Sequence, residues 1–161
     1  MMIVVADSSP LIVLLDIGHI DILPELFTHV VIPPEVAAEL TRSNRPHVVR
    51  EFIASAPPWL SERAPARAEA IPALHAAECA AISLARELNA HVLLIDEVRG
   101  RRAAAQRRIR FTGTIGVLEL AAERGLLDLK DAFERIKQTD FWISHDLLDE
   151  RLRLHSPREK S

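Results

Sequence analysis

The segment His91–Ile95 (HVLLI) restricts the fold more than any other part of the sequence. It is a continuous apolar run that ends at Asp96. Because polar residues do not alternate with apolar ones, the run is typical of a strand in a parallel sheet that helices cover on both faces. A second short apolar run, Ile3–Ala6, ends in the same way at Asp7. Both segments therefore predict strands of one α/β fold.

Helix signals alternate with strand signals along the chain. Ser8, Ser9 and Pro10 supply capping residues and a first-turn proline for a helix through Leu15. Further strands are expected at 29–32, near 59 and at 109–112, and further helices at 33–40, 46–55, 74–89, 99–107, 114–124, 130–137 and 145–154. This alternation predicts an α/β sandwich around a central parallel sheet, in which ligands bind beyond the carboxyl ends of the strands.

The length of the chain suits one domain. Of its 161 residues, we assign 1–155 to that domain and expect 156–161 to form a frayed tail. No apolar run reaches the roughly 18 residues that span a bilayer, and the apolar N-terminus lacks the basic region of a signal peptide. The single cysteine, Cys79, favours a reducing compartment, so we expect a cytoplasmic protein that does not associate with membranes.

Two aspartates mark the expected binding edge. Asp7 and Asp96 each directly follow a strand, so both should project from the carboxyl edge of the sheet. Two carboxylates about 4 Å apart repel by roughly 4 kcal/mol at an effective dielectric of about 20, and a bound divalent cation would relieve that repulsion. The alternative is that each aspartate only caps the helix that follows it. The occurrence of both together favours a functional site.

Glu78 is the third acidic residue of interest. On a helical wheel, Ile82 and Ala85 lie on nearly the same line as Glu78, whereas Ser83 and Arg86 mark the solvent face. Glu78 should therefore point towards the sheet from the border of the apolar stripe. A buried carboxylate is costly unless it is paired, so it either pairs with an arginine or helps to bind a metal. The alternative is a border glutamate whose carboxylate reaches water.

Oxygen ligands of this kind suit Mg²⁺ or Mn²⁺. Such an ion polarises a phosphate and generates hydroxide from water for in-line attack, which predicts products with a 3′-hydroxyl and a 5′-phosphate. Other chemistries find less support, because the seven histidines show no zinc-ligand spacing and GTIG at 113–116 is too short for a phosphate-binding loop. Cys79 is expected to be a packing residue rather than a nucleophile.

A basic stretch follows Asp96. Six arginines and no acid lie between Arg99 and Arg110, although the net charge of −3 argues against a protein that coats nucleic acid. Proximity to Asp96 makes Arg99, Arg101 and Arg102 the expected contacts to the phosphates of a bound nucleic acid. The alternative is a solvated helix face with ordinary salt bridges. Because aromatic residues are scarce and tyrosine is absent, we expect recognition of backbone and shape more than base stacking.

The sequence resembles PIN domains over nearly its whole length. The resemblance lies in ADSSPLI at 6–12, VVIPPEVAAEL at 30–40, AAECAAISLA at 76–85, LLIDEVRGRRAA at 93–104 and GTIGVLELA at 113–121. Together with IDILPELF at 20–27 and a late FWIS, these segments resemble a branch of uncharacterised prokaryotic PIN proteins close to toxins of the VapC type. The resemblance implies a three-layer α/β/α sandwich with a central parallel sheet. It also implies a Mg²⁺- or Mn²⁺-dependent endoribonuclease with Asp7, Glu78 and Asp96 as its acids.

The resemblance also suggests auxiliary residues and one departure. The small polar residue that follows the first acid matches Ser8 or Ser9, which could hold a metal-bound water or cap the helix. Many PIN nucleases have a fourth acid roughly twenty residues after the third, where this chain has Thr114. Glu97 could substitute, although a residue next to Asp96 in extended chain would point the other way. A missing acid favours one-metal catalysis or weak activity.

The resemblance implies partners as well. Similar proteins pair into homodimers, and their toxin members are held by a small antitoxin whose segment inserts near the acids. The apolar segment PLIVLLDIGHIDIL at 10–23 could form such an interface or belong to the core. We therefore expect a toxin-type endoribonuclease that acts on RNA. The alternatives are a non-catalytic PIN-like module that binds RNA or protein, and a housekeeping RNA-processing nuclease.

Overall fold

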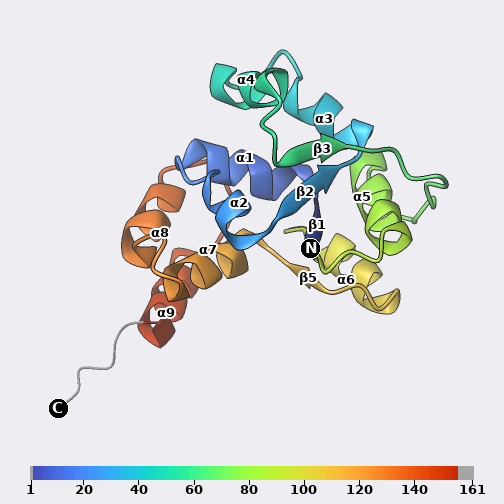
Figure 1. The fold of residues 1–161 in the computed structure, drawn as a ribbon. Coiled ribbons are helices and arrows are strands. Elements are labelled where there is room, and N and C mark those ends of the chain that lie inside the picture. Colours follow the sequence, from blue (N-terminus) through green and yellow to red (C-terminus); the bar gives the residue numbers. More distant parts are fainter. Residues whose placement is uncertain (1, 156–161) are drawn as a thin grey trace.

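A five-stranded parallel sheet forms the centre of the molecule in the computed structural model, which describes residues 2–155 (Figure 1). Its strands, in the order β3-β2-β1-β4-β5, are β1 (Ile3–Ala6), β2 (His29–Ile32), β3 (Leu60–Glu62), β4 (Val92–Leu94) and β5 (Phe111–Thr112). Every adjacent pair is parallel. The prediction of a parallel sheet is confirmed, and β1 lies in its middle.

Helices connect and cover these strands. Within residues 2–155 they are α1 (Ser8–Asp16), α2 (Ile22–Leu26), α3 (Pro34–Leu40), α4 (His47–Ser55), α5 (Ala76–Glu87), α6 (Val98–Gln106), α7 (Thr114–Glu123), α8 (Leu129–Lys137) and α9 (His145–His155). The short helix α2 was not expected from the sequence. It contains Pro24 and spans less than two turns, so no helical periodicity could develop. Its stability comes from burial of Ile22, Leu23 and Leu26.

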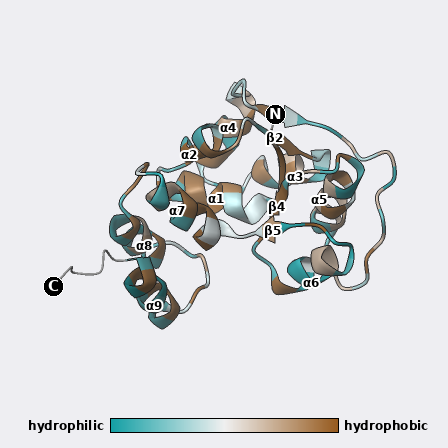
Figure 2. Ribbon diagram, turned by 60° about the horizontal axis from the view of Figure 1, so that its bottom comes forward, coloured by the Kyte–Doolittle hydropathy of each residue, from teal (hydrophilic) through white to brown (hydrophobic). Residues whose placement is uncertain are grey.

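Alternate residues of the strands feed two separate hydrophobic cores. Val4 and Ala6 of β1 pack in one core, with α1, α7 and α8, whereas Val5 packs in the other, with α5 and α6. The sheet is therefore the middle layer of a three-layer α/β/α sandwich, as expected. In Figure 2 the peripheral helices α8 and α9 show both hydrophobic and hydrophilic sides, which fits helices that cover a core and face solvent.

The apolar segment 10–23 belongs to the core. Leu11, Leu14 and Leu23 are fully buried within the chain, and Val13 and Ile17 are nearly so. Of the two roles considered for this segment, the core role therefore holds. None of the helices within residues 2–155 is both long enough and apolar enough to cross a bilayer. The predicted tail, 156–161, lies outside the described residues.

Candidate active site

Asp7 and Asp96 lie together at the carboxyl edge of the sheet. Ala6 of β1 is in register with Leu94 of β4, and the backbone N–H of Asp7 donates to the carbonyl of Leu94 at 2.9 Å. The two aspartates therefore leave neighbouring strands at almost the same level. This geometry follows from the parallel order of β1 and β4, which the two apolar runs of the sequence predict.

The carboxylate of Asp7 is buried in a strongly acidic environment. The residue is only 6% exposed, and its Oδ1 has no hydrogen-bond partner among the described residues. The pKa of Asp7 is raised to about 7, chiefly by burial and also by the charges of Glu78, Glu39 and Asp96, while the hydrogen bond from the N–H of Ser8 partly lowers it. Its side chain makes no N-cap hydrogen bond to α1 within the described structure. Helix capping alone therefore does not explain this aspartate.

Asp96 differs from Asp7 because hydrogen bonds fix its carboxylate. Its Oδ2 accepts from the hydroxyls of Ser9 at 2.8 Å and Thr114 at 2.7 Å, and its Oδ1 accepts from the N–H of Thr114 at 2.7 Å. A Cβ on Gly113 would lie 2.6 Å from that Oδ1, so glycine permits this close approach. Ser9 and the fully buried Thr114 thus position Asp96, while Asp96 binds the first N–H of α7.

Glu78 is more deeply buried than its border position on the helical wheel indicated. It is 7% exposed, and its Oε1 accepts from the N–H of His75 at 3.2 Å. Its Oε2 is buried and has no partner within residues 2–155. Neither pairing with an arginine nor contact of the whole carboxylate with water fits this geometry. One oxygen of Glu78 is therefore left without compensation, as is one oxygen of Asp7.

The approach of α6 to Glu78 depends on Gly100. A Cβ at this position would lie 2.4 Å from Cδ1 of the fully buried Ile95 and 3.4 Å from Oε2 of Glu78. We therefore expect Gly100→Ala to lower the free energy of unfolding by about 1–3 kcal/mol, because the added methyl group overpacks the core. Urea denaturation would measure this loss. The exposed Gln106→Ala variant on the same helix should change it by less than about 0.5 kcal/mol, and equal effects would contradict this packing.

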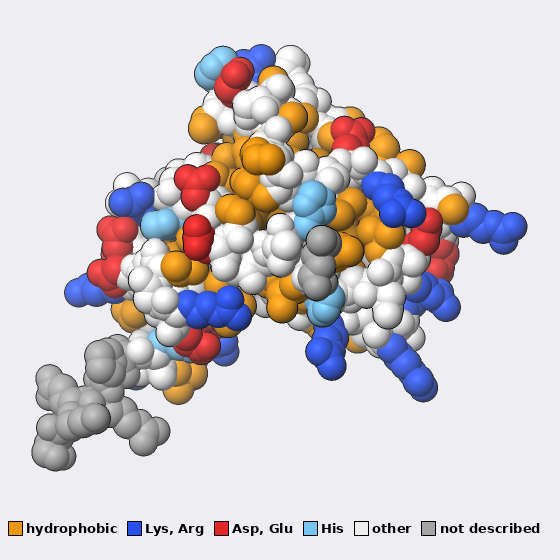
Figure 3. Space-filling view, in the orientation of Figure 1, with side chains coloured by type: hydrophobic (Ala, Val, Ile, Leu, Met, Phe, Trp, Pro, Cys, Tyr) orange, Lys and Arg blue, Asp and Glu red, His pale blue; other side chains and the backbone are white. Residues whose placement is uncertain are grey.

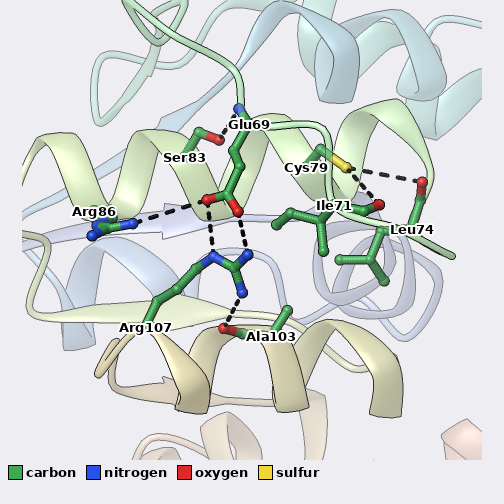
Figure 4. Close-up of polar contacts among 8 residues, drawn as sticks. All are labelled: Glu69, Ile71, Leu74, Cys79, Ser83, Arg86, Ala103 and Arg107. Carbon is green, nitrogen blue, oxygen red and sulfur yellow. Dashed lines mark hydrogen bonds and ion pairs between the residues drawn. The ribbon is translucent and has the colours of Figure 1, made fainter.

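A surface clamp holds the segment that leads into α5 (Figure 4). The N–H of Glu69 donates to Oγ of Ser83 at 2.9 Å, and the carboxylate of Glu69 pairs with Arg107 and, at 3.9 Å, with Arg86. Arg107 also donates to the carbonyl of Ala103 on α6 at 3.0 Å. Ser83 is therefore buried rather than solvent-facing, because the segment from 63 to 75 covers it. The clamp fixes the approach to the first turn of α5, which carries Glu78.

Cys79, next to Glu78, is also covered by this segment. The residue is buried, and its thiol lies 3.8 Å from the carbonyl oxygen of Ile71 and 3.9 Å from that of Leu74 (Figure 4). Burial among these backbone groups agrees with the packing role expected from the sequence.

A fourth carboxylate, from Glu39 on α3, joins the cluster. Its Oε2 accepts a hydrogen bond from Oγ of Ser8, and its charge contributes to the raised pKa of Asp7. Thr114 occupies the position at which many PIN nucleases have a fourth acid, and Glu39 is a further acid of the cluster that was not predicted from the sequence. The sequence offered only a weak signal for Glu39. It lies on a helix that follows a central strand, but Glu35 on the same helix has an equally good position.

Asp7, Glu39 and Glu78, though not Asp96, line a hollow of about 560 Å³, which we call the acidic hollow. Its acidic residues are Asp7, Asp16, Glu39, Glu78, Glu97 and Asp140. Burial raises the pKa of Asp16 and the charge of Asp140 raises it further, whereas Arg45, which also lines the hollow, lowers it. Glu97 is exposed and lines this hollow with Asp7 and Glu78, whereas Asp96 does not, which agrees with the expectation that neighbouring residues in an extended chain point in different directions.

The donor set suits a hard divalent cation. Carboxylate oxygens are the preferred ligands of Mg²⁺ and Mn²⁺, and two buried oxygens, Oδ1 of Asp7 and Oε2 of Glu78, lack partners among the described residues. As the side chains lie, no three acidic, histidine or cysteine residues within 2–155 are arranged to hold one ion. Holding an ion would therefore require rotation of carboxylates or water molecules between ion and protein, which Mg²⁺ commonly retains.

The basic residues lie on α6, beside the acids. Nη2 of Arg101 lies 3.9 Å from Oδ1 of Asp96, and its Nε donates to the carbonyl of Ile95 at 3.0 Å. Arg99 and Arg102 are exposed and form no ion pair with any described residue. Figure 3 shows Lys and Arg side chains projecting separately into solvent on the side where α5 and α6 lie. Of the three predicted RNA contacts, Arg101 is the one that the fold brings to an acid.

Comparisons with known proteins agree with this architecture. Residues 3–157 match the family model described as DUF3368: PIN domain. A solved structure of a PilT N-terminus domain protein, SSO1118 from Sulfolobus solfataricus P2, has a TM-score of 0.55 and 17% identity. The match covers 76% of this chain and 95% of that one, and at this identity it supports the fold alone. None of the curated proteins searched matches the chain. The family match extends over most of the sequence, and the chain belongs to the PIN domain family.

Proposed function

We propose that the protein is a Mg²⁺- or Mn²⁺-dependent endoribonuclease. The PIN fold is of the nuclease type, and one observation supports activity in this member. The charges of Glu39, Glu78 and Asp96 all act on Asp7 at the carboxyl edge of the sheet, and one buried carboxylate oxygen of Asp7 and one of Glu78 have no partner among the described residues. Such an arrangement destabilises the folded protein unless a cation compensates it. A cation site explains this cluster of carboxylates better than a purely structural role does.

In this proposal the side chains have distinct roles. Asp7 and Glu78 would hold the cation with their unpartnered oxygens, and Asp96, fixed by Ser9 and Thr114, would provide an oriented carboxylate. Arg101 would contact the phosphate beside Asp96. Bound here, Mg²⁺ or Mn²⁺ would supply charge stabilisation for the phosphate and an activated water for in-line attack. Ser8 would keep Glu39 directed towards Asp7.

Cleavage of an end-labelled RNA hairpin tests the proposal. We expect cutting with Mn²⁺ or Mg²⁺, loss of cutting in EDTA, recovery when metal is restored, and products that carry a 5′-phosphate and a 3′-hydroxyl. Products that end in a 2′,3′-cyclic phosphate, or cleavage that survives both EDTA and the double change Asp7→Asn and Asp96→Asn, would refute the mechanism.

We further propose that this nuclease is the toxin of a toxin–antitoxin pair, with a small antitoxin and a second copy of the chain as partners. Its motivation is the resemblance of its segments to toxins of the VapC type. Expression should arrest growth, a small neighbouring open reading frame should relieve the arrest, and Asp96→Asn should not be toxic. Growth arrest that no neighbouring gene relieves would favour a housekeeping RNA-processing nuclease.

One observation favours a second candidate function, a non-catalytic module that binds RNA. Among the described residues, no three potential ligands are arranged to hold a metal ion. This alternative predicts that calorimetry detects no saturable Mn²⁺ binding at pH 8 while RNA binding persists. Saturable binding that Asp7→Asn removes would exclude it.

A further inference from the structure

A second hollow adjoins the acidic hollow, and we call it the aromatic hollow. It has a volume of about 560 Å³, and its lining includes Asp96, Arg101, Phe111, Phe141, Trp142 and Leu147. Phe141 lines both hollows. Ser9, in the acidic hollow, donates to Asp96, in the aromatic hollow, at 2.8 Å. A chain bound at the acids could therefore continue into the aromatic hollow.

Several large apolar side chains of this hollow are exposed. Trp142 is 92% exposed, Leu147 is 45% exposed and Phe111 is 36% exposed. Single exposed apolar residues are common on protein surfaces, but several that line one hollow indicate a binding surface. The indole of Trp142 in particular makes little contact with its own chain, so neither of its faces is used for packing.

The loop that carries Trp142 is nevertheless anchored on both sides. Before it, Oγ1 of Thr139 donates to the carbonyl of Ile136 at 2.7 Å and accepts from the N–H of Phe141 at 3.2 Å. After it, the N–H of Leu147 donates to Oγ of Ser144 at 3.3 Å. The exposed indole therefore projects from a short loop with fixed ends.

An ion pair between the buried Glu119 of α7 and the partly exposed Arg151 of α9 fixes another part of the lining of the hollow. Glu119 of α7 is 5% exposed and accepts from Nε of Arg151 on α9 at 2.9 Å, and its Oε2 lies 2.6 Å from Nε2 of His155. Glu119 and Arg151 both line the hollow. Because these contacts tie α9 to α7, the hollow exists before any ligand binds.

Arg101 gives the hollow a cationic group beside an aromatic plane. Its guanidinium carbon lies 5.9 Å from the ring centroid of Phe111, and its Nη2 lies 3.9 Å from Oδ1 of Asp96. A guanidinium can stack on a base or bind a phosphate, and exposed aromatic rings stack on unpaired bases. An apolar surface alone would suit a protein partner equally well. The presence of Arg101 and Asp96 in the same hollow favours a nucleic-acid chain.

We propose that the aromatic hollow binds unpaired RNA nucleotides next to the scissile phosphate, with Trp142 and Phe111 stacking on bases and Arg101 contacting the backbone. This inference rests on the proposed function and adds a requirement for single-stranded RNA at the site. It differs from the expectation, drawn from the scarcity of aromatic residues, that the chain recognises backbone and shape more than it stacks on bases. Three of the seven aromatic residues of the chain, Phe111, Phe141 and Trp142, line the same hollow as Asp96.

Fluorescence of a single tryptophan provides the test. The chain contains two tryptophans, so Trp59→Phe leaves Trp142 as the sole reporter, and EDTA prevents cleavage during titration. A single-stranded RNA decamer should quench this fluorescence, and an RNA duplex of the same composition should not. In anisotropy titrations, Trp142→Ala should raise the Kd for the decamer about tenfold or more, and Trp142→Phe should largely restore it. Leu154→Ala, 71% exposed on α9, is the control and should leave the Kd unchanged.

Each outcome either supports or overturns the inference. An unchanged Kd for both Trp142→Ala and Phe111→Ala would overturn it, as would a duplex that binds as tightly as the single strand. A change of molecular mass on light scattering with an unchanged Kd would overturn it in favour of a protein interface. If the protein binds RNA in a manner that depends on Trp142 but does not cleave it, only the proposed nuclease function is refuted. Cleavage by Trp142→Ala with an unchanged KM would refute only the stacking site.

Discussion

The Asp7→Asn variant is expected to be more stable than the wild type at pH 8 without metal, and to lose RNA cleavage at least about a thousandfold. The two effects have one cause. Asp7 is buried with an unpartnered oxygen among three other carboxylates, so its charge destabilises the folded chain. Asparagine has the same shape without that charge, but it is a poor ligand for a hard cation.

The direction of the pH dependence follows from the raised pKa. Because burial and the neighbouring carboxylates raise the pKa of Asp7 from 3.8 to about 7, the folded state binds this proton more tightly than the unfolded state does. The resulting stabilisation is fully present below about pH 4 and is lost as the pH rises through 7. The stability advantage of Asp7→Asn should therefore shrink by up to about 4 kcal/mol between pH 8 and pH 4.

Urea denaturation of both proteins in EDTA, from pH 4 to pH 8, measures this difference. The exposed Asp21→Asn variant is the control and should follow the wild type at every pH. Adding Mn²⁺ at pH 8 should raise the Tm of the wild type and leave that of Asp7→Asn unchanged, because only a protein that binds the ion gains stability from it. A stability difference that does not vary with pH would contradict the buried charge of Asp7.

Much of the fold could be predicted because each strand carries its own signal. Ile3–Ala6 and His29–Ile32 are strands with the expected bounds, and the helix ending at Leu40 begins at the proline pair as expected. Uninterrupted apolar runs report burial on both faces, and prolines mark the first turn of helices. The helix α2 was missed because it is too short to show periodicity, and tertiary packing stabilises it instead.

The site was predictable only where secondary structure alone determines position. Asp7 and Asp96 directly follow neighbouring parallel strands, so strand order brings them together. The role of Thr114 could not be predicted in this way, because it depends on a hydrogen bond to Asp96, 18 residues away in the sequence. Through this bond Thr114 positions Asp96 and does not replace an acid. Trp142 reaches the hollow of Phe111 only through the packing of α9 on α7, which no local pattern encodes.

Glu39 illustrates the same limit, and its replacement is the second large effect that we expect. Glu39→Gln preserves an oxygen that can accept from Ser8 but removes a charge from beside Asp7. If Glu39 belongs to the cation site, the change should lower Mn²⁺ affinity and RNA cleavage by about 10- to 100-fold, as is typical for groups that support a metal site. It should also lower the pKa of Asp7, because the charge of Glu39 raises it.

Two measurements separate this role from a merely structural one. Calorimetry with Mn²⁺ reports the affinity for the ion. The pH dependence of unfolding in EDTA reports the change in the pKa of Asp7 and requires neither bound metal nor enzymatic activity. Glu35→Gln, on the same helix, is the matched control and should change neither, because Glu35 does not line the acidic hollow. Equal effects of the two glutamine variants would exclude Glu39 from the cluster. If Glu39→Gln shifts the pKa of Asp7 but leaves the Mn²⁺ affinity unchanged, Glu39 is an electrostatic neighbour of Asp7 that does not support the metal site.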